Sequence, residues 1–295
     1  MPAHRLKKEA PYLLFVLPAF LIYTTLTILP TLTTFLYSFT NYDGLSPHAR
    51  FIGIMNYVKV MTTGNVVNSL KNSIVYGFVT PLLVTLLAIP LALVLNGRMR
   101  TRNMQRSIFF FPSVISALFV GYIWNFILSP SSQGLINGLL EKAGAKKLLL
   151  LADPHQAMGY LILVSVWCTV GWHACIYLAN LQVIPTEYYE ASYMDGAGPF
   201  NRFRHITLPM LAPAMTTSVM LLITGNLKAF DLPFALTNGG PGYVTTMITQ
   251  TIITEGVSAN RVGFASAMSF IFFVMIMIVT MVQLRVMRAR EENLS

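Results

Sequence analysis

Two carboxylates and a proline lie at the start of a short polar segment, residues 185–205, in an otherwise apolar chain. Pro185 suits the first turn of a helix, and Glu187 and Glu190 are favoured near the positive N-terminal end of the helix dipole. No paired carboxylates and no metal-ligand cluster can be recognised from spacing anywhere in the chain. The segment therefore predicts a charged helix that contacts a surface, and we expect neither catalytic nor metal-binding residues.

The residues that follow these carboxylates predict a sharp end to the helix. Ala191 and Ser192 are small, so another surface can approach this part of the helix closely. Gly196 and Gly198 then stop the helix and permit a tight turn. Apolar residues resume at helical spacing at Phe200, Phe203 and Ile206. The pattern predicts a short helix, a turn and a second helix that enters a membrane; an amphipathic helix that merely lies on the bilayer surface is the alternative.

The rest of the chain has the composition of a membrane protein. Of its 295 residues, 55% are hydrophobic and 11% are charged, whereas a soluble domain carries about 25% charged residues. A transmembrane helix needs about 20 apolar residues. Windows free of Asp, Glu, Lys and Arg predict six spans, over 10–42, 72–97, 107–140, 154–186, 205–227 and 262–284. A seventh window, 232–254, is interrupted by an Asn-Gly-Gly-Pro-Gly run and is expected to form an outer loop with a short helix.

Basic residues predict the orientation of these spans. Twelve of the 20 Lys and Arg residues would lie on one side of the membrane, which is the cytoplasmic side by the positive-inside rule. The densest group lies in residues 98–106, between the second and third spans. Both termini are therefore predicted to be cytoplasmic. Because the basic residues lie beside apolar spans, no nucleic-acid partner is expected.

The polar segment resembles a known motif. In the permease subunits of binding-protein-dependent ABC importers, Glu-Ala-Ala is followed after three residues by Gly, and after nine more by Ile-x-Leu-Pro. Here Glu190-Ala191-Ser192 is followed by Gly196 and then by Ile206-Thr207-Leu208-Pro209. Ser192 departs from the pattern but keeps a small residue. The stretches at 194–198, 236–242 and 51–57 are similar to the carbohydrate branch of this family, and the resemblance is closest to the F-type subunits of maltose permeases.

The resemblance implies a transport subunit rather than an enzyme. Its fold would be that of a type I ABC importer permease, all-α with six transmembrane helices, in the bacterial inner membrane. Its partners would be a second homologous permease subunit, two cytoplasmic ATPase subunits that bind ATP and Mg²⁺, and an extracytoplasmic solute-binding protein. The chain itself would bind no cofactor. The helix around 187–195 would be the coupling helix, seated in a cleft of the ATPase, with Glu190 as its anchoring anion. The residues assigned to coupling are Glu187, Glu190, Ala191, Ser192, Asp195 and Gly196.

Polar side chains within the predicted spans indicate where a solute could bind. Such side chains usually face the protein interior or a water-filled path, and a sugar needs hydrogen-bonding groups and an aromatic face. Together with the resemblance, this predicts solute-binding residues at Ser113, Ser116, Ser165, Cys168, Thr169, Trp172 and Asn226. Leu222 stands at another contact position of the family, which indicates a solute other than maltose. The alternative for each hydroxyl is a hydrogen bond to its own helix backbone.

These expectations divide the chain into a cytoplasmic N-terminal tail, a first transmembrane helix, an outer loop, a core permease domain with the coupling loop 185–205, and a cytoplasmic C-terminal tail. Their predicted ranges are 1–10, 11–39, 40–70, 71–284 and 285–295. The expected solute is a carbohydrate or related polyol. A glycerol phosphate or another non-sugar solute is one alternative. A secondary active transporter is another, although the charge-free windows contain no acid that could relay protons.

Overall fold

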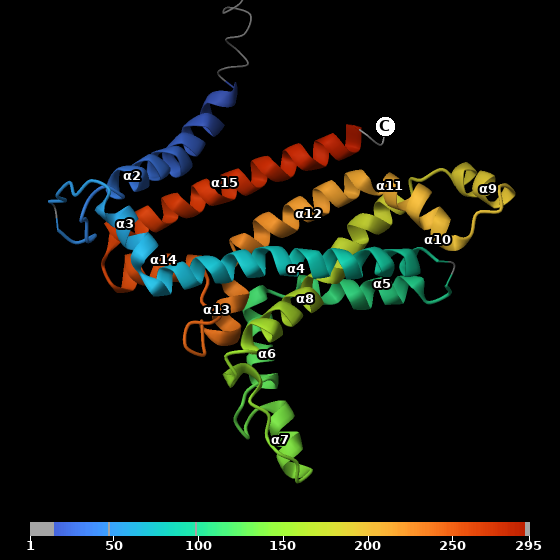
Figure 1. Cartoon of the computed structure of the whole chain (residues 1–295), viewed down its shortest axis with the longest axis horizontal. Helices are drawn as coiled ribbons and strands as arrows, with labels where there is room; N and C mark the ends of the chain where they lie inside the picture. The colour runs from blue at the N-terminus through green and yellow to red at the C-terminus, as the bar shows by residue number, and fades with distance from the viewer. Residues whose placement is uncertain (1–14, 47, 98, 293–295) are drawn as a thin grey trace, which may run out of the picture. The chain divides into compact units, whose positions relative to one another are not determined.

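In the computed structural model the chain is described over residues 15–46, 48–97 and 99–292 (Figure 1). The predicted tail 1–10, the beginning of the predicted span 11–39, and residues 293–295 lie outside this range. All named elements in the described part are helical, and the one strand-like feature there is an isolated antiparallel bridge between Thr40 and Phe51. The predicted all-α fold class is therefore confirmed.

The predicted membrane spans appear in the structure as straight helices and as bent pairs. Four helices are long and apolar enough to cross a membrane, namely Phe15–Tyr37, α4 (Gly64–Asn96), α8 (Ala157–Leu181) and α15 (Val262–Glu292) through Met287. Two further spans arise if each of two bent helix pairs counts as one. Pro81 and Pro90 both lie inside α4 without interrupting it, as membrane helices allow.

The third predicted span, 107–140, is not one continuous helix. Helix α5 (Arg102–Phe110) passes into a 3₁₀ turn, η2 (Phe111–Val114), and the chain then bends by 95° into α6 (Ala117–Ile127). Pro112 lies in the turn. Proline has no N–H to donate, and its ring clashes with the carbonyl four residues earlier, so it disfavours a continuous α-helix at this point. The fifth span is likewise bent, by 66°, between α11 (Leu208–Met210) and α12 (Ala212–Leu227).

The chain divides into two compact units, unit 1 (Met1–Thr63 and Ile252–Phe273) and unit 2 (Gly64–Thr251 and Val274–Ser295). In unit 2, α8 lies against α4, and α5 and α12 pack on this pair (Figure 1). The largest buried side chains of this core include Tyr76 on α4 and Tyr177 on α8. Leu227 of α12 packs so tightly on Gly77 of α4 that a Cβ at Gly77 would lie 2.4 Å from its side chain.

Shorter helices of unit 2 follow from the breaks in the apolar pattern. They are α7 (Leu135–Lys142), η3 (Leu150–Ala152), α9 (Thr186–Met194), α10 (Pro199–Arg202), η4 (Phe203–Thr207), α13 (Asp231–Thr237) and α14 (Ile248–Ile253). In the seventh apolar window α13 ends just before the Asn-Gly-Gly-Pro-Gly run, where Asn238 adopts a left-handed conformation. Figure 1 shows α9 and α10 beyond the end of α8, away from the α4–α8 core.

Unit 1 consists of two segments that are far apart in the sequence, one before α4 and one that begins at Ile252. The helix Phe15–Tyr37 contains a π turn, η1 (Thr24–Ile28), and continues as α2 (Leu29–Tyr37). The predicted outer loop 40–70 contains a helix that the charge-free windows did not reveal, α3 (Met55–Thr62). A second π turn, η5 (Thr254–Ser258), precedes α15.

Candidate functional site

The predicted coupling segment forms the expected helix, turn and helix. Pro185 precedes α9, whose first turn carries Glu187. Gly196 has a φ of +72°, a left-handed conformation that glycine adopts without strain. The turn is closed by two backbone hydrogen bonds, from Gly196 N–H to the carbonyl of Tyr193 (3.1 Å) and from Ala197 N–H to the carbonyl of Ser192 (2.9 Å). This is the Schellman geometry of a helix C-terminus, so the end of α9 is fixed by its own backbone.

Side chains also attach α9 to the segment that follows it. The Tyr189 hydroxyl lies 3.0 Å from the Thr207 hydroxyl, and the Arg202 guanidinium lies 3.7 Å above the ring centroid of Tyr193. Sequence reasoning missed both contacts, because residues 18 and 9 positions apart are brought together only by the turn at Gly196. These contacts make α9 a positioned element rather than a loose loop.

Ser192 differs from its expected role. Its small size predicted that an external surface could approach it, but its side chain is buried within the chain and donates a hydrogen bond to the Tyr189 carbonyl at 2.7 Å. Ala191 is exposed and remains available for close approach. The turn at Gly196 brings the following segment against one side of α9, and Ser192 faces that side.

The other side of α9 carries charge and apolar surface. Glu187, Glu190 and Asp195 are exposed, and in the described part of the chain none of them is within ion-pair distance of a basic group. Large apolar side chains are exposed beside them, at Tyr188, Tyr193, Met194 and Phe200, with Met194 89% exposed. Exposed aromatic and aliphatic groups gathered in this way are typical of a docking surface, and the unpaired carboxylates favour a partner surface that carries basic groups.

The predicted solute-binding residues divide between buried and exposed positions. On α8, Ser165 and Cys168 are buried, Thr169 is half-buried and Trp172 is 39% exposed. Cys168 connects α8 to the bent third span, because its thiol donates to the Pro112 carbonyl at 3.4 Å. In that bend Ser113 is half-buried and Ser116 is exposed. The structure therefore brings the α8 candidates and the third-span candidates to neighbouring elements.

Three of these polar side chains form hydrogen bonds within their own helix or turn. Ser113 donates to the Phe110 carbonyl at 2.6 Å, and Thr169 donates to the Ser165 carbonyl at 2.8 Å. Asn226, which is buried on α12, donates to the Leu222 carbonyl at 2.9 Å. The Thr169 hydrogen bond reaches another candidate, Ser165, but only at its backbone carbonyl, and the described hydrogen bonds of Ser113 and Asn226 reach no other candidate. Ser116 and Trp172 are the candidates with the most accessible surface.

Sequence reasoning did not identify Gly171 of α8, which determines how closely α8 approaches the third span. A Cβ at Gly171 would lie 1.8 Å from the carbonyl oxygen of Phe109, so only glycine permits this contact. The available signal in the sequence was a glycine in an apolar span between the bulky residues Trp167 and His173, which is compatible with close helix packing. His173 forms a buried hydrogen bond of 2.7 Å with Ser218 of α12, so its role is to join α8 and α12.

Residues 60–291 match the family described as "Binding-protein-dependent transport system inner membrane component". The chain is 32% identical to the trehalose/maltose transport system permease protein MalF of Thermococcus litoralis, over 95% of this chain and 94% of the relative. It is also 32% identical to the multiple sugar-binding transport system permease protein MsmF of Streptococcus mutans, over 86% of this chain and 87% of the relative.

A solved structure has the same fold. It belongs to a bacterial ABC transporter involved in the import of the acidic polysaccharide alginate, and it superposes with a TM-score of 0.84 at 22% sequence identity. The match covers 97% of this chain and 98% of that one. A second structure of an alginate ABC transporter, in complex with an alginate pentasaccharide-bound periplasmic protein, also has a TM-score of 0.84 at 21% identity, covering 98% and 97%.

Proposed function

The chain belongs to the family of inner membrane components of binding-protein-dependent transport systems, and from that premise we propose that it forms half of the passage of an ATP-driven importer for a carbohydrate or related polyol. As a member of this family it is a membrane transport subunit and not an enzyme. Membership also argues against the secondary transporter, because these systems depend on a binding protein. A glycerol phosphate or another non-sugar solute is the remaining alternative.

A carbohydrate solute is supported by the range of similar permeases. Besides the trehalose/maltose and multiple-sugar relatives, the chain is 29% identical to the arabinooligosaccharides transport system permease protein AraP of Bacillus subtilis, over 95% of this chain. The accessible Trp172 and Ser116 supply the aromatic face and hydroxyl group that a sugar needs. We assign solute contacts to the seven predicted residues in α8, α12 and the bend of the third span.

The proposed assembly contains this chain, a second homologous permease, two cytoplasmic ATPase subunits and an extracytoplasmic solute-binding protein. ATP and Mg²⁺ bind to the ATPase subunits in this proposal, and both termini of this chain lie in the cytoplasm. The family description and the periplasmic protein in the alginate transporter complex support the binding protein. The basic residues of the predicted inner loops support the orientation.

The observation that carries the proposal is the unpaired surface of α9. The helix has a fixed C-terminal turn, exposed carboxylates at Glu187, Glu190 and its C-cap Asp195, and exposed aromatic residues. In the described chain no basic group lies within ion-pair distance of these carboxylates, and Arg202 lies over the Tyr193 ring. In the proposed mechanism α9 inserts into a cleft of the ATPase, where Glu190 meets a basic residue. Closure of the ATPase dimer on ATP then moves α9, and the permease alternates between two packings as rigid bodies.

The direct test reverses the charge at Glu190. In the complete importer, Glu190→Lys should reduce sugar uptake about tenfold or more, because losing an anchoring ion pair at an interface costs about 2 kcal/mol or more. Insertion and folding should be unchanged, since the side chain is exposed. The control is Glu141→Lys on α7, which reverses an exposed carboxylate outside the proposed coupling surface. Glu141 pairs with Lys147 at 3.5 Å, so this variant loses an ion pair within the chain and not one with the ATPase. Normal uptake by Glu190→Lys, with the ATPase still bound, would contradict the coupling role.

The solute assignment has its own test. Ser116→Ala and Trp172→Leu should each raise the KM for the transported sugar about fivefold, since one hydrogen bond or ring contact contributes about 1 kcal/mol. Thr217→Val is the control, because this exposed hydroxyl on α12 bonds its own helix at Pro213. Unchanged KM values in both variants would remove these two residues from the solute path without affecting the coupling proposal.

A further inference from the structure

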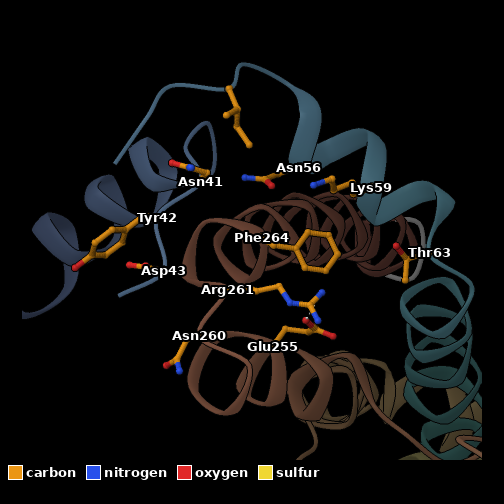
Figure 2. A pocket seen from close by; sticks show the side chains of 11 residues that line it. Asn41, Tyr42, Asp43, Asn56, Lys59, Thr63, Glu255, Asn260, Arg261 and Phe264 are labelled. Atoms are coloured by element: carbon orange, nitrogen blue, oxygen red, sulfur yellow. Dashed lines mark ion pairs between the residues drawn. The ribbon is translucent and has the colours of Figure 1, made fainter. Parts of the chain in front are cut away.

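Unit 1 contains a pocket of about 330 Å³ that is lined mainly by polar and charged residue types and by none of the predicted solute-binding residues. It is formed by the segment after α2, by α3 with the residue that follows it, and by residues from η5 to the first turn of α15 (Figure 2). Its lining residues are Asn41, Tyr42, Asp43, Ile52, Asn56, Lys59, Thr63, Glu255, Asn260, Arg261 and Phe264. The volume is within the usual range for small-molecule sites, about 300–1,000 Å³.

The walls of this pocket are fixed by hydrogen bonds that do not use the Lys59, Arg261 or Glu255 side chains. The amide of Asn56 donates to the carbonyls of Ser38 (2.9 Å) and Thr40 (2.8 Å), which attaches α3 to the end of α2. Gly263 N–H donates to the Tyr42 carbonyl at 2.8 Å, and a Cβ at Gly263 would lie 2.2 Å from the Thr40 carbonyl oxygen. The pocket is therefore preorganised by backbone contacts within unit 1.

Asp43 belongs to this framework and not to the binding groups. Its carboxylate accepts hydrogen bonds from the backbone N–H groups of Ser46 (2.8 Å) and Leu45 (2.9 Å) and from the Ser46 hydroxyl. The backbone hydrogen bonds from Ser46 and Leu45 are the main cause of its pKa falling to about 2. Asp43 thus remains ionised at neutral pH and holds its loop in one conformation.

Other polar groups in the pocket are free to bind a ligand. Lys59 is exposed, and no carboxylate in the described part of the chain lies within ion-pair distance of it. Arg261 pairs with Glu255 at 3.2 Å, yet its side chain is 62% exposed. Asn260 is exposed and has a φ of +51°. Figure 2 shows the Phe264 ring between Lys59 on one wall and the Arg261–Glu255 pair on the other.

We propose that this pocket binds one ring of a polyhydroxylated solute. The ammonium and guanidinium groups donate to ring hydroxyls, and the Glu255 carboxylate and the amide oxygen of Asn260 accept from them. Phe264, which is 8% exposed, presents only a small apolar area to the ring's carbon face. The two acids and two bases of the lining balance in formal charge, which favours a neutral ring over a free anion. The inference goes beyond the proposed function, because these residues belong to unit 1 and to none of the seven solute contacts assigned above.

The test uses a thiol at the pocket's edge and maltose as the probe. Maltose need not be the transported solute, because the proposal requires only one polyhydroxylated ring in the pocket. Thr63→Cys places the thiol on a lining residue, whereas Thr62→Cys places it on the exposed neighbour that does not line the pocket. The full chain is assembled with its partners in lipid nanodiscs free of maltoside detergent. The rate of maleimide labelling at the new thiol is followed by site-resolved mass spectrometry, so the native cysteines do not interfere. Maltose should slow labelling of Thr63→Cys along a saturable curve, by about fivefold at its plateau, and leave Thr62→Cys unchanged.

A second pair of variants ties the protection to the pocket's chemistry. Added to Thr63→Cys, Lys59→Met should abolish protection by maltose, because it keeps an unbranched side chain that is shorter by only the terminal nitrogen and removes its donors. Lys71→Met, which changes an exposed side chain on α4 outside the pocket, should retain it. The proposal is overturned if maltose protects neither thiol, if it protects both equally, or if only the binding protein or an acidic peptide protects Thr63→Cys. Because labelling does not require uptake, failure here is distinguishable from failure of the coupling test at Glu190.

Discussion

Helices α8 and α9 follow each other in the chain with only a short connection between Leu181 and Thr186, yet they are held in place by opposite means. In α8, 61% of the most apolar window is buried, by packing against α4, α5 and α12. In α9 only Ser192 is buried, and the helix is fixed by its C-terminal turn and two side-chain contacts. The comparison indicates that α8 determines how the subunit is packed, whereas α9 is shaped in advance for a partner.

The strongest way to test the packing role of α8 is to add one methyl group. Gly171→Ala would place a Cβ 1.8 Å from the Phe109 carbonyl oxygen, and we expect a loss of about 3 kcal/mol in the free energy of unfolding, as in overpacked cores. Denaturant titration in bicelles measures it. Gly159→Ala is the control on the same helix, because a Cβ there meets nothing within 4 Å. Equal stability of the two variants would contradict close packing at Gly171.

A somewhat smaller effect should follow from breaking the link between α8 and α12. Ser218→Ala leaves the buried His173 ring nitrogen without its partner at 2.7 Å, and this should cost about 2 kcal/mol of unfolding free energy. The same titration applies. Thr217→Val, one position along α12 and exposed, should change the stability little. If both substitutions had the same effect, the hydrogen bond would not be stabilising.

For α9 the expected effect is local. Gly196→Ala forces a side chain into a left-handed conformation, at a cost of about 1 kcal/mol, which should weaken the turn without changing global stability. Hydrogen exchange of the α9 amides should become faster and ATPase binding weaker. Gly198→Ala, where φ is −70° and nothing lies within 4 Å of the new Cβ, should leave both unchanged. A global loss of stability would mean that α9 resembles α8 after all.

The smallest effect is expected at the Arg202 guanidinium, which lies over Tyr193. Because Tyr193 is exposed, Arg202→Gln should cost about 0.5 kcal/mol, visible as slightly faster exchange at the end of α9. Arg204→Gln, an exposed neighbour, is the control. An effect as large as that of Gly196→Ala would show that the side-chain contact, not the glycine turn, orders α9.

Charge-free windows predicted the straight helices well, because length and composition alone decide whether a segment can span a bilayer. They did not predict the 95° break of the third span. Pro81 and Pro90 leave α4 unbroken, whereas the helix ends near Pro112. The difference lies in tertiary contacts that no local pattern reveals, namely the bond from Cys168 to the Pro112 carbonyl and the close approach at Gly171.

For the coupling segment, the helix, its carboxylates and the turn at Gly196 could be predicted from local residue types. The burial of the Ser192 side chain could not be predicted, because it depends on the path of the chain after the turn. The sequence also could not predict which solute candidates are exposed, because hydroxyl residues in apolar spans look alike in sequence whether they are buried or exposed. The pocket in unit 1 combines residues about 200 positions apart, and no single stretch of sequence indicates it.

The bend between Val114 and Ala117 also constrains where this subunit can meet hydrocarbon chains. Backbone amides and carbonyls released where a helix stops cannot face lipid, because nothing there can hydrogen-bond to them. That flank must consequently be sealed by protein or bathed by water. The kink thereby distinguishes the side of the subunit that faces protein or water from the side that faces lipid.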